Sequence, residues 1–385
     1  MGFSRMGTNK RTAVMYGAGN IGRGFIGQVF SDSGFEVVFV DVDHDVISGL
    51  NERNSYTQLI IDGDQVSRHE VTGVRAVDGY DKDVVSSVIA DCDILAVSVG
   101  AAVLPHIAPL LADGLSIRTQ PLNILVCENL IHAPAVLKEF VSKHLSDKSK
   151  LERIGFVGAT IGRMVPVVPP QQRKNDPTSI AVEPFCTLPI DGDAVVYPMP
   201  ELKYTNLCSP FAFEEGKKLY IHNMGHSLAA YYGFLQGYEF VWQSMENEVI
   251  YGQVHGAMKA TAEALARKYN EDRALLLGYV EDLLHRFGNK GLGDSVARVG
   301  GDPMRKLAPG DRLIGAVDLC NEQGVECTPI LHGIAAAMQF NMPGDPSASL
   351  LRERVSEIGV ITFLKDYCGI SDADTLKSIV DNTYL

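Results

Sequence analysis

The chain of 385 residues is longer than a single hydrophobic core usually supports, so its length favours two domains. Hydrophobic residues make up 46% and charged residues 21%, which is typical of a globular protein, and its apolar runs are too short to span a membrane. The net charge of -13 argues against nucleic acid and anionic membranes as partners.

The N-terminal segment and the cysteines bear on where the protein works. Residues 1–10 are polar and lack the apolar centre of a signal peptide, so we expect a flexible extension that takes no part in the fold. The seven cysteines form no CxxC pair and no zinc-type spacing with histidine. We therefore predict reduced thiols, a cytoplasmic protein and no metal site.

Strands and helices alternate through the first half of the chain. An apolar run at 11–16 is followed by a glycine-rich turn, a helix over 21–32 and a second strand at 36–41. Further strands are predicted at 93–99, 122–127 and 154–157. Nearly continuous apolar strands separated by helices indicate a parallel sheet that is covered on both faces.

The turn after the first strand matches the GxGxxG pattern. Its residues are Gly17-Ala18-Gly19-Asn20-Ile21-Gly22. The first glycine permits the tight turn, the second lets the backbone approach a pyrophosphate, and the third lets the helix pack closely on the strand. A glycine turn alone can be merely a tight loop, but its position between a strand and a helix favours a Rossmann-type dinucleotide site.

An acidic residue ends the second predicted strand. Asp41 lies at the spacing from the glycine turn where a carboxylate accepts hydrogen bonds from the adenosine ribose. A carboxylate there would repel a 2′-phosphate, so we predict NAD rather than NADP as the cofactor. Asp43 is an alternative for the same role, and a solvated strand end is another. Val99 and Gly100 end a later strand and, by topology, are expected near the nicotinamide ribose.

After about residue 200 the pattern becomes helical. Helices are predicted over 218–235, 247–269, 274–287, 329–338 and 348–367. The fold class is therefore α/β, with a Rossmann-type, mostly parallel sheet followed by a mainly helical domain. We predict an NAD-binding domain over 11–200 and a substrate and catalytic domain over 201–385. The proline-rich segment 166–200 is expected to connect them.

One helix of the second domain carries three residues with catalytic potential. Asn223 and His226 are three residues apart and would share a face. Lys218 and Asn223 diverge by about 140° on an ideal α-helix. The three side chains converge only if the helix is irregular or the lysine reaches forward, and a solvated helix start is the alternative.

This arrangement behind a Rossmann-type domain resembles the polyol-specific long-chain dehydrogenases. The resemblance covers nearly the whole chain after residue 10. It rests on motifs at 17–27 (GAGNIGRGFIG), 127–129 (CEN), 218–226 (KLYIHNMGH), 298–300 (RVG), 305–307 (RKL), 310–313 (GDRL) and 333–338 (GIAAAM). Several motifs in one order are much harder to obtain by chance than a single glycine turn.

The resemblance implies metal-independent hydride transfer between a polyol carbon and NAD. The expected reaction interconverts mannitol 1-phosphate and fructose 6-phosphate. Lys218 would be the general base, while Asn223 and His226 would hydrogen-bond the reacting oxygen. Asn129, at the end of a predicted parallel strand, is expected to contact the substrate.

A phosphorylated substrate needs cationic partners. Arg305 and Lys306 are the first candidates, because arginine binds phosphate through paired hydrogen bonds and lysine acts as a point charge. A surface ion-pair cluster with Asp302 and Asp311 is an equal alternative for these two residues.

The chain departs from the family pattern at one position. Relatives have an Asp-Arg pair followed by an apolar residue and then proline or serine, but here Gly162 replaces the aspartate while Arg163 remains. In relatives that carboxylate lies near the active site, so its loss bears on substrate identity and activity. A related polyol dehydrogenase with another substrate and a catalytically silent NAD-binding sensor are therefore alternatives.

Overall fold

The computed structural model describes residues 11–130, 132–166 and 176–383. The chain divides into two compact units, of which the first ends at Phe211 and the second begins at Ala212. Strand β11 (Thr205–Cys208) pairs with β10 (Leu188–Asp191), which explains why the segment after residue 200 belongs to the first unit. The predicted extension at residues 1–10 lies outside the described residues.

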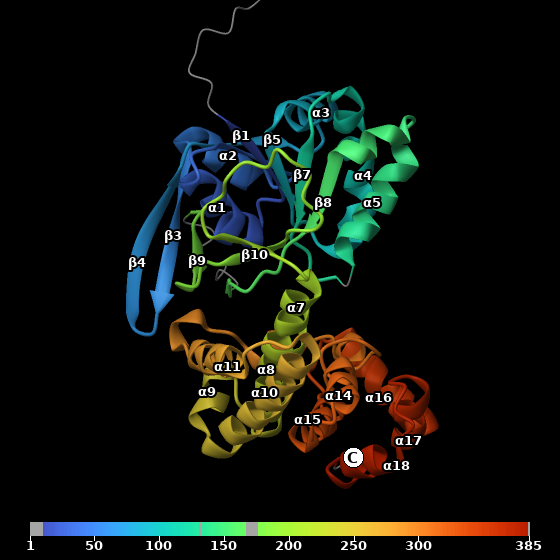
Figure 1. Ribbon diagram of the computed structural model, residues 1–385. Coiled ribbons are helices and arrows are strands. Elements are labelled where there is room, and N and C mark those ends of the chain that lie inside the picture. The colour runs from blue at the N-terminus through green and yellow to red at the C-terminus, as the bar shows by residue number, and fades with distance from the viewer. Residues whose placement is uncertain (1–10, 131, 167–175, 384–385) are drawn as a thin grey trace, which may run out of the picture. The chain divides into compact units, whose positions relative to one another are not determined.

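A six-stranded parallel sheet forms the centre of the first unit (Figure 1). Its strands are β1 (Thr12–Tyr16), β2 (Glu36–Asp41), β5 (Val74–Asp78), β6 (Ile94–Val97), β7 (Leu122–Val126) and β8 (Ile154–Gly158). They lie in the order β5-β2-β1-β6-β7-β8, with Ala13 of β1 opposite both Val37 and Ile94. This strand order is that of the Rossmann fold, and the predicted fold class is confirmed.

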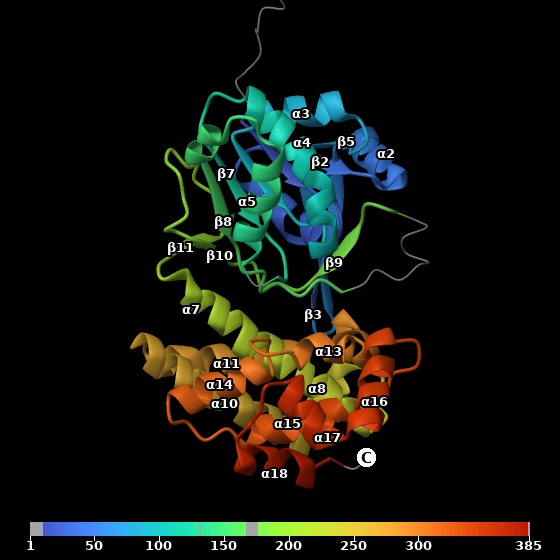
Figure 2. The ribbon, with the colours of Figure 1, turned by 90° about the vertical axis from the view of Figure 1, so that its right-hand side faces the viewer.

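Alternate residues of the strands supply two separate cores. On β1, Met15 belongs to one core and Val14 to the other. Helices α3 (Lys82–Asp91), α4 (Leu104–Ile117) and α5 (Ala133–His144) cover the face of Val14 (Figure 2). Helices α1 (Gly27–Asp32) and α2 (His44–Arg53) pack on the face of Met15. Because both faces are buried, the strands read as continuous apolar runs rather than as an alternation.

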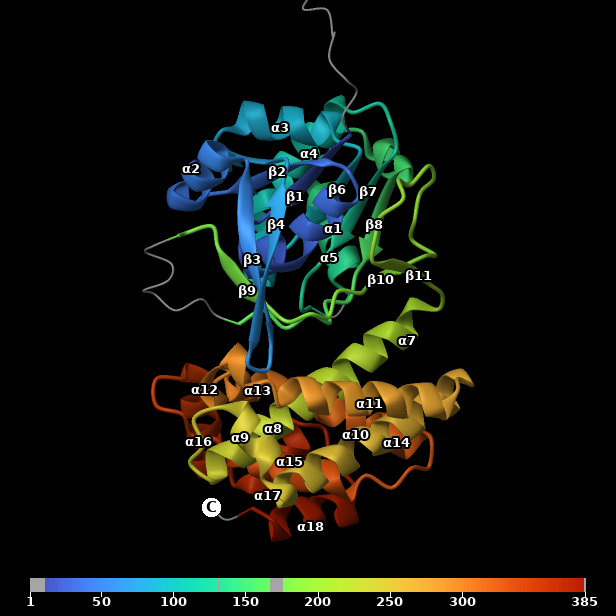
Figure 3. The ribbon, with the colours of Figure 1, turned by 90° about the vertical axis from the view of Figure 1, so that its left-hand side faces the viewer.

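A second sheet of three strands was not expected from the sequence. It contains the antiparallel hairpin of β3 (Ser55–Asp62) and β4 (Gln65–Thr72), with β9 (Ile180–Val182) parallel to β3 (Figure 3). Most side chains of β4 are polar and exposed, so the strand lacks the alternation that reveals a half-buried strand. Strand β9 lies in the segment predicted only as a connection.

The second unit is mainly helical, as predicted. Its elements are α7 (Phe211–Gly216), the π-helix η4 (Lys217–Asn223), α8 (Met224–Leu235), α9 (Val241–Glu246), α10 (Glu248–Tyr269), α11 (Arg273–Phe287), the short 3-10 helix η5 (Lys290–Leu292), α12 (Val296–Gly300), α13 (Pro303–Lys306), α14 (Ile314–Glu322), α15 (Thr328–Met338), α16 (Pro346–Ile358), α17 (Val360–Asp366) and α18 (Ala373–Asp381). Helix α8 packs against α9, α10, α12 and α15.

The single helix predicted over 348–367 is two helices, because Gly359 has a φ of +80° and interrupts the helical backbone. Within the described ranges, no helix combines the length and the apolar character that crossing a bilayer requires.

One lysine is buried in the helical unit. Lys306 is 3% exposed, and its Nζ donates a 2.5 Å hydrogen bond to the carbonyl of Val299. The ammonium also lies 5.7 Å from the ring centroid of Tyr231. Burial, followed by the positive charges of Arg312 and Arg305, lowers the pKa of Lys306 to about 7.

The lowered pKa predicts a pH dependence of stability that Lys306→Met removes. Between pH 7 and the ordinary lysine pKa of 10.5, the unfolded chain binds a proton that the folded chain does not. The free energy of unfolding of the wild type should therefore rise with pH, by up to about 1.4 kcal/mol per pH unit relative to the variant. Urea unfolding of both proteins at several pH values from 6 to 9 measures this difference. A difference that does not change with pH would contradict the shift.

Candidate active site

The glycine turn between β1 and the following helix leaves no room for side chains at its two ends. Gly17 has a φ of +102°, and a Cβ there would lie 2.2 Å from the carbonyl oxygen of Ser98. A Cβ on Gly22 would lie 2.0 Å from the carbonyl oxygen of Gly17. At Gly19, by contrast, no atom of the described chain beyond the adjacent residues lies within 4 Å of a Cβ. A ligand can therefore approach the backbone closely at Gly19, as a pyrophosphate requires.

Asp41 joins the end of β2 to this turn. Its Oδ2 accepts a 2.5 Å hydrogen bond from the N–H of Ala18. Its Oδ1 accepts hydrogen bonds from the N–H groups of Val42 and Asp43, at 2.7 and 3.0 Å. The side chain of Asp43 instead accepts hydrogen bonds from the first turn of α2 and caps that helix. Of the two carboxylates considered from the sequence, Asp41 is therefore the one that contacts the glycine turn.

A π turn, η1 (Gly22–Ile26), begins the helix after the glycine turn. The carbonyl of Arg23 accepts hydrogen bonds from the hydroxyl of Tyr56 at 2.8 Å and from Nε2 of Gln58 at 2.7 Å. The Arg23 side chain is 6% exposed and donates from Nε to the carbonyl of Ala18 at 2.5 Å. Arg23 therefore braces the glycine turn, a role that its place in the sequence motif did not reveal.

Glu128 organises the chain after β6. Its Oε1 accepts hydrogen bonds from the N–H groups of Val99 and Gly100, at 2.7 and 3.0 Å. Burial raises the pKa of the Glu128 carboxyl, and these two hydrogen bonds oppose the rise. Asn129 follows directly and is exposed beyond the carboxyl end of β7. This role of Glu128 was not predicted from the sequence, although the residue lies in the motif at 127–129.

The candidate cofactor residues share one edge of the parallel sheet. The glycine turn follows β1, Asp41 ends β2, and Val99 follows β6, and these three strands are parallel neighbours. Strand β7, which Asn129 follows, is the next neighbour. Ligands of open α/β sheets bind at the carboxyl ends of the strands, where the strand order reverses.

In the helical unit, the predicted catalytic residues lie on and beside a π turn. The π-helix η4 continues directly into α8. A π turn closes between residues five apart rather than four. Lys218 and Asn223 are five apart, so they lie closer to one side of the helix than the ideal α-helical divergence predicts. His226 follows on the first turn of α8.

Two adjacent lysines on this turn have different surroundings. Lys217 Nζ lies 2.9 Å from Glu214 and 5.4 and 5.1 Å from the ring centroids of Phe213 and Tyr279. It is therefore held in a local cluster of one carboxylate and two rings. The positive charge of Lys218 instead contributes to lowering the pKa values of His222 and His226.

His226 is packed between a ring and a carboxylate. It stacks on Phe287 with ring centroids 4.7 Å apart and an interplanar angle of 9°. Its Nε2 lies 3.2 Å from Oδ2 of Asp294, whose other oxygen pairs with Arg298. Burial lowers the pKa of His226, and Asp294 only partly opposes this effect. The charges of Arg298 and Lys218 lower the pKa further, so the ring is neutral near pH 7.

His222 lies on the π turn itself and is 2% exposed. Its ring meets Phe287 edge-on, with centroids 5.6 Å apart, and lies 6.2 Å from the ring of His226. Burial, and then the charges of Lys218 and Arg286, hold the pKa of His222 well below its usual value. The surroundings of Lys218 therefore include two neutral imidazoles.

The two residues predicted to bind phosphate are in different environments. Arg305 donates to Asp302 at 2.7 Å and lies 3.5 Å from Asp311, with 46% of its side chain exposed. The ion-pair cluster that we considered as the alternative is thus formed. Lys306 is buried and directed at the carbonyl of Val299. Binding of phosphate by either residue stays a prediction.

At the departure from the family pattern, Gly162 faces an aromatic ring. A Cβ on Gly162 would lie 3.0 Å from Cε1 of Phe185, so an aspartate there would displace or press on the ring. The retained Arg163 is 3% exposed and donates to the carbonyl of Glu183 at 2.9 Å and to Oε1 of Gln28 at 2.6 Å. Arg163 thus joins the segments of Glu183 and Gln28 within the first unit, although position 162 carries no aspartate.

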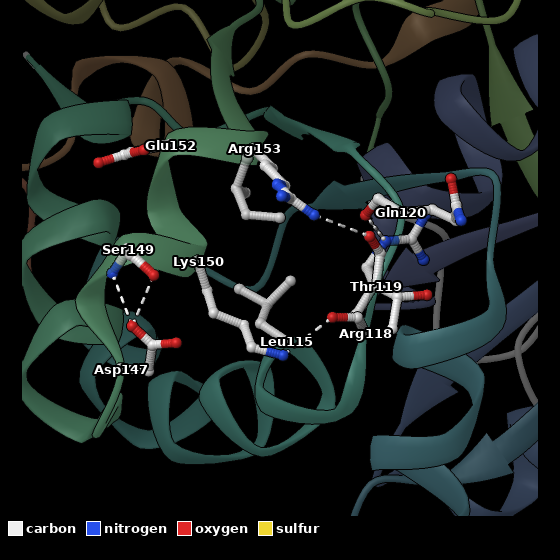
Figure 4. Close-up of a pocket in the computed structure, with 10 residues that line it drawn as sticks. Leu115, Arg118, Thr119, Gln120, Asp147, Ser149, Lys150, Glu152 and Arg153 are labelled. Atoms are coloured by element: carbon white, nitrogen blue, oxygen red, sulfur yellow. Dashed lines mark hydrogen bonds between the residues drawn. The ribbon is translucent and has the colours of Figure 1, made fainter.

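A pocket of about 260 Å³ opens elsewhere on the first unit (Figure 4). It lies beside the 3-10 helix η3 (Lys148–Arg153), at the amino ends of β7 and β8, opposite the cofactor edge of the sheet. Lys150 donates to the carbonyls of Ser116 and Arg118, at 2.5 and 3.0 Å, near the end of α4. The Arg118 guanidinium likewise donates to main-chain carbonyls. Both cations are therefore paired with main-chain carbonyls. We assign the pocket no role in the candidate site, because it lies at the opposite ends of the strands.

Among the described residues, no three histidine, cysteine, aspartate or glutamate side chains lie close enough together to hold a metal ion. All seven cysteines are free thiols.

Family models and known proteins match nearly the whole chain. Residues 11–204 match the mannitol dehydrogenase Rossmann domain, and residues 211–374 match the mannitol dehydrogenase C-terminal domain. A mannitol-1-phosphate 5-dehydrogenase of Brevibacillus brevis is 36% identical over 376 residues, covering 96% of each chain. One of Geobacillus thermodenitrificans is 34% identical and covers 97% of this chain and 98% of its own.

Solved structures share the fold at low sequence identity. The mannitol 2-dehydrogenase of Pseudomonas fluorescens, solved with NAD and D-mannitol, has a TM-score of 0.76 at 17% identity, covering 97% of this chain and 91% of its own. A D-sorbitol dehydrogenase has a TM-score of 0.70 at 15% identity, covering 97% and 98%. The resemblance stated from the sequence motifs is confirmed, and the chain belongs to the mannitol dehydrogenase family.

Proposed function

We propose that this chain is an NAD-dependent dehydrogenase that interconverts mannitol 1-phosphate and fructose 6-phosphate without a metal ion. The observation that carries the proposal is the π turn that turns Lys218 and Asn223 toward one side, directly before His226. Relatives named mannitol-1-phosphate 5-dehydrogenase, similar over nearly the full chain, support the choice of substrate.

The first unit fits NAD. The open space at Gly19 would admit the pyrophosphate, and the Asp41 carboxylate beside the turn would accept hydrogen bonds from the ribose hydroxyls. The same negative charge disfavours the additional phosphate of NADP. When bound, the nicotinamide accepts a hydride during polyol oxidation and supplies one during ketose reduction. Val99 and Gly100, held by Glu128, are proposed to contact its ribose.

In the helical unit, Lys218 is proposed as the general base. Its unprotonated Nζ takes the hydroxyl proton as the adjacent carbon loses its hydride, and its N–H returns that proton to the oxygen in ketose reduction. The Asn223 amide is proposed to donate a hydrogen bond to the same oxygen and to stabilise its developing negative charge. Asn129, in the first unit, is proposed as a further contact of the substrate.

A related enzyme with a different polyol substrate is the second candidate. Gly162 favours it, because the family pattern implied by the resemblance has a carboxylate where this chain has a glycine against the Phe185 ring. The pairing of Arg305 with Asp302 also leaves less positive charge for a substrate phosphate. We still propose Arg305 and Lys306 as the phosphate contacts. The preference of the enzyme for phosphorylated or free ketoses distinguishes the two candidate functions.

Initial rates of NADH oxidation with a panel of ketoses test the proposal. We expect fructose 6-phosphate to be reduced with a higher kcat/KM than free fructose, and the rate to survive EDTA. Preference for free fructose would overturn the phosphorylated substrate. Tight NADH binding without turnover of any ketose would instead favour an NAD-binding sensor.

Asp41→Asn tests the cofactor site, with Asp43→Asn as the matched control. Asparagine at position 41 loses the charge that accepts the ribose hydroxyls, so NADH affinity should fall by about tenfold or more. Discrimination against NADPH should fall as well. Asparagine at position 43 keeps the cap of α2 and should leave both affinities within about twofold. Fluorescence titration with NADH and NADPH measures this, and equal affinities in the two variants would contradict the role of Asp41.

Lys218→Met tests the base, with the neighbouring Lys217→Met as its control. Loss of a positioned general base should lower kcat by about 10² to 10⁴-fold while NADH affinity stays unchanged. Lys217→Met removes a lysine held by Glu214, so it should retain most of the activity. Similar losses of kcat in both variants would show that the turn needs lysines for its structure and not Lys218 for proton transfer.

A further inference from the structure

One buried carboxylate in the helical unit contacts the candidate catalytic histidine. Asp294 lies directly before α12 and is 8% exposed. Its main-chain carbonyl accepts a 2.9 Å hydrogen bond from the N–H of Val241, which fixes the backbone there. Its Oδ2 lies 3.2 Å from Nε2 of His226. The main chain of Asp294 is therefore fixed where its carboxylate contacts the His226 ring.

Arg298 keeps this carboxylate charged. The guanidinium sits one helical turn further along the chain and pairs with Oδ1 of Asp294, leaving Oδ2 for His226. Burial alone would raise the pKa of Asp294, but His226 and Arg298 together outweigh burial and hold it below its usual value. Asp294 is thus an acceptor at both oxygens near neutral pH.

The position of Asp294 decides which tautomer the ring adopts. A neutral imidazole has one N–H donor and one acceptor nitrogen. Nε2 is the ring nitrogen that contacts the acceptor-only carboxylate, so the proton is assigned to Nε2. The 3.2 Å contact falls short of full hydrogen-bond geometry, and neither Nε2 nor Oδ2 has a hydrogen-bond partner among the described residues. Nδ1 is then left as the acceptor.

We infer that Asp294 is the positioning residue of His226, which it holds with Nε2 protonated and Nδ1 presented to the substrate as a hydrogen-bond acceptor. This inference rests on the proposed function. It also divides the work among the neighbouring residues. Asn223 donates to the reacting oxygen, whereas the neutral His226 accepts a hydrogen bond from a substrate hydroxyl and orients the polyol. His226 is therefore not a donor to the developing negative charge.

The charges around His226 set the direction of its pH response. Lys218 and His222 face it from η4, Asp294 from the segment before α12, and Arg298 from α12, while Arg286 of α11 acts on His222. Asp294 is the only one of these groups that favours the imidazolium. Its neutralisation should therefore shift protonation of His226 to lower pH.

The tautomer can be measured without any substrate. In wild-type protein labelled with ¹⁵N-histidine, with the His226 signals assigned by their loss in His226→Gln, we expect a protonated Nε2 and an unprotonated Nδ1 at pH 7 and above. The reverse pattern would overturn the inference, whatever the protein catalyses. The measurement also separates this inference from the proposed function, which depends on turnover.

Asp294→Asn tests the consequence for catalysis. Because Arg298 can only donate, the asparagine oxygen should face it and the amide NH₂ should face His226. Nε2 then becomes the acceptor and Nδ1 carries the proton, so the substrate hydroxyl loses the acceptor for its own proton. We expect kcat/KM for fructose 6-phosphate to fall by about 10²-fold, with NADH affinity unchanged and the acidic limb of the pH profile moved to lower pH.

Asp282→Asn provides the matched control. Asp282 is half-exposed on α11 and pairs with Arg286 at 3.2 Å, so its loss removes a carboxylate from the same unit without touching His226. It should leave kcat/KM and the pH profile unchanged. An Asp294→Asn protein that binds NADH and keeps wild-type kcat/KM would contradict the positioning role. If the wild type itself reduces no ketose, the proposed function fails and the ¹⁵N measurement still decides the tautomer.

Discussion

In each unit, the helix that carries candidate site residues begins with a π turn, and the directions of those side chains depend on the extra residue in that turn. In the first unit, the Arg23 carbonyl of η1 accepts hydrogen bonds from the side chains of Tyr56 and Gln58, which anchor the helix start after the glycine turn. In the helical unit, η4 turns Lys218 and Asn223 toward one side. Helices with irregular turns of this kind are frequent at functional sites.

Three carboxylates contact main-chain or side-chain groups of the candidate sites. Asp41 holds the N–H of Ala18, Glu128 holds the N–H groups after β6, and Asp294 holds His226. Asp41 and Glu128 accept hydrogen bonds from main-chain N–H groups, and Asp294 contacts the imidazole at 3.2 Å, so each carboxylate has a partner instead of adding an unpaired charge to an already acidic chain. The candidate residues of each unit are thus positioned by acceptors.

The sequence was most informative where local pattern and topology coincide. Apolar strands of a sheet buried on both faces, and a glycine turn between strand and helix, have few alternatives, so the parallel sheet and the position of Asp41 at a strand end could be predicted. The β3–β4 hairpin could not, because its exposed polar strand carries no apolar alternation. The burial of Lys306 was equally hidden, since lysine is among the residue types least often buried.

The helix that begins with η4 shows a second limit of prediction from the sequence. Ideal α-helical geometry separates Lys218 from Asn223, and only family resemblance suggested that they act together, because an inserted residue leaves no mark in the apolar periodicity. The Asp294 contact with His226 joins residues far apart in the chain, and no local spacing announces it. The ring of Phe287, which stacks on His226, likewise comes from a helix distant in the sequence.

A crystal structure of the protein with NADH and fructose 6-phosphate would show whether the π turn directs Lys218 and Asn223 at one reacting oxygen. We expect the Lys218 Nζ and the Asn223 amide nitrogen within about 2.6–3.2 Å of the ketone oxygen of the sugar. A ketone oxygen bound by other residues, with Lys218 turned away from it, would contradict the proposed roles of both residues.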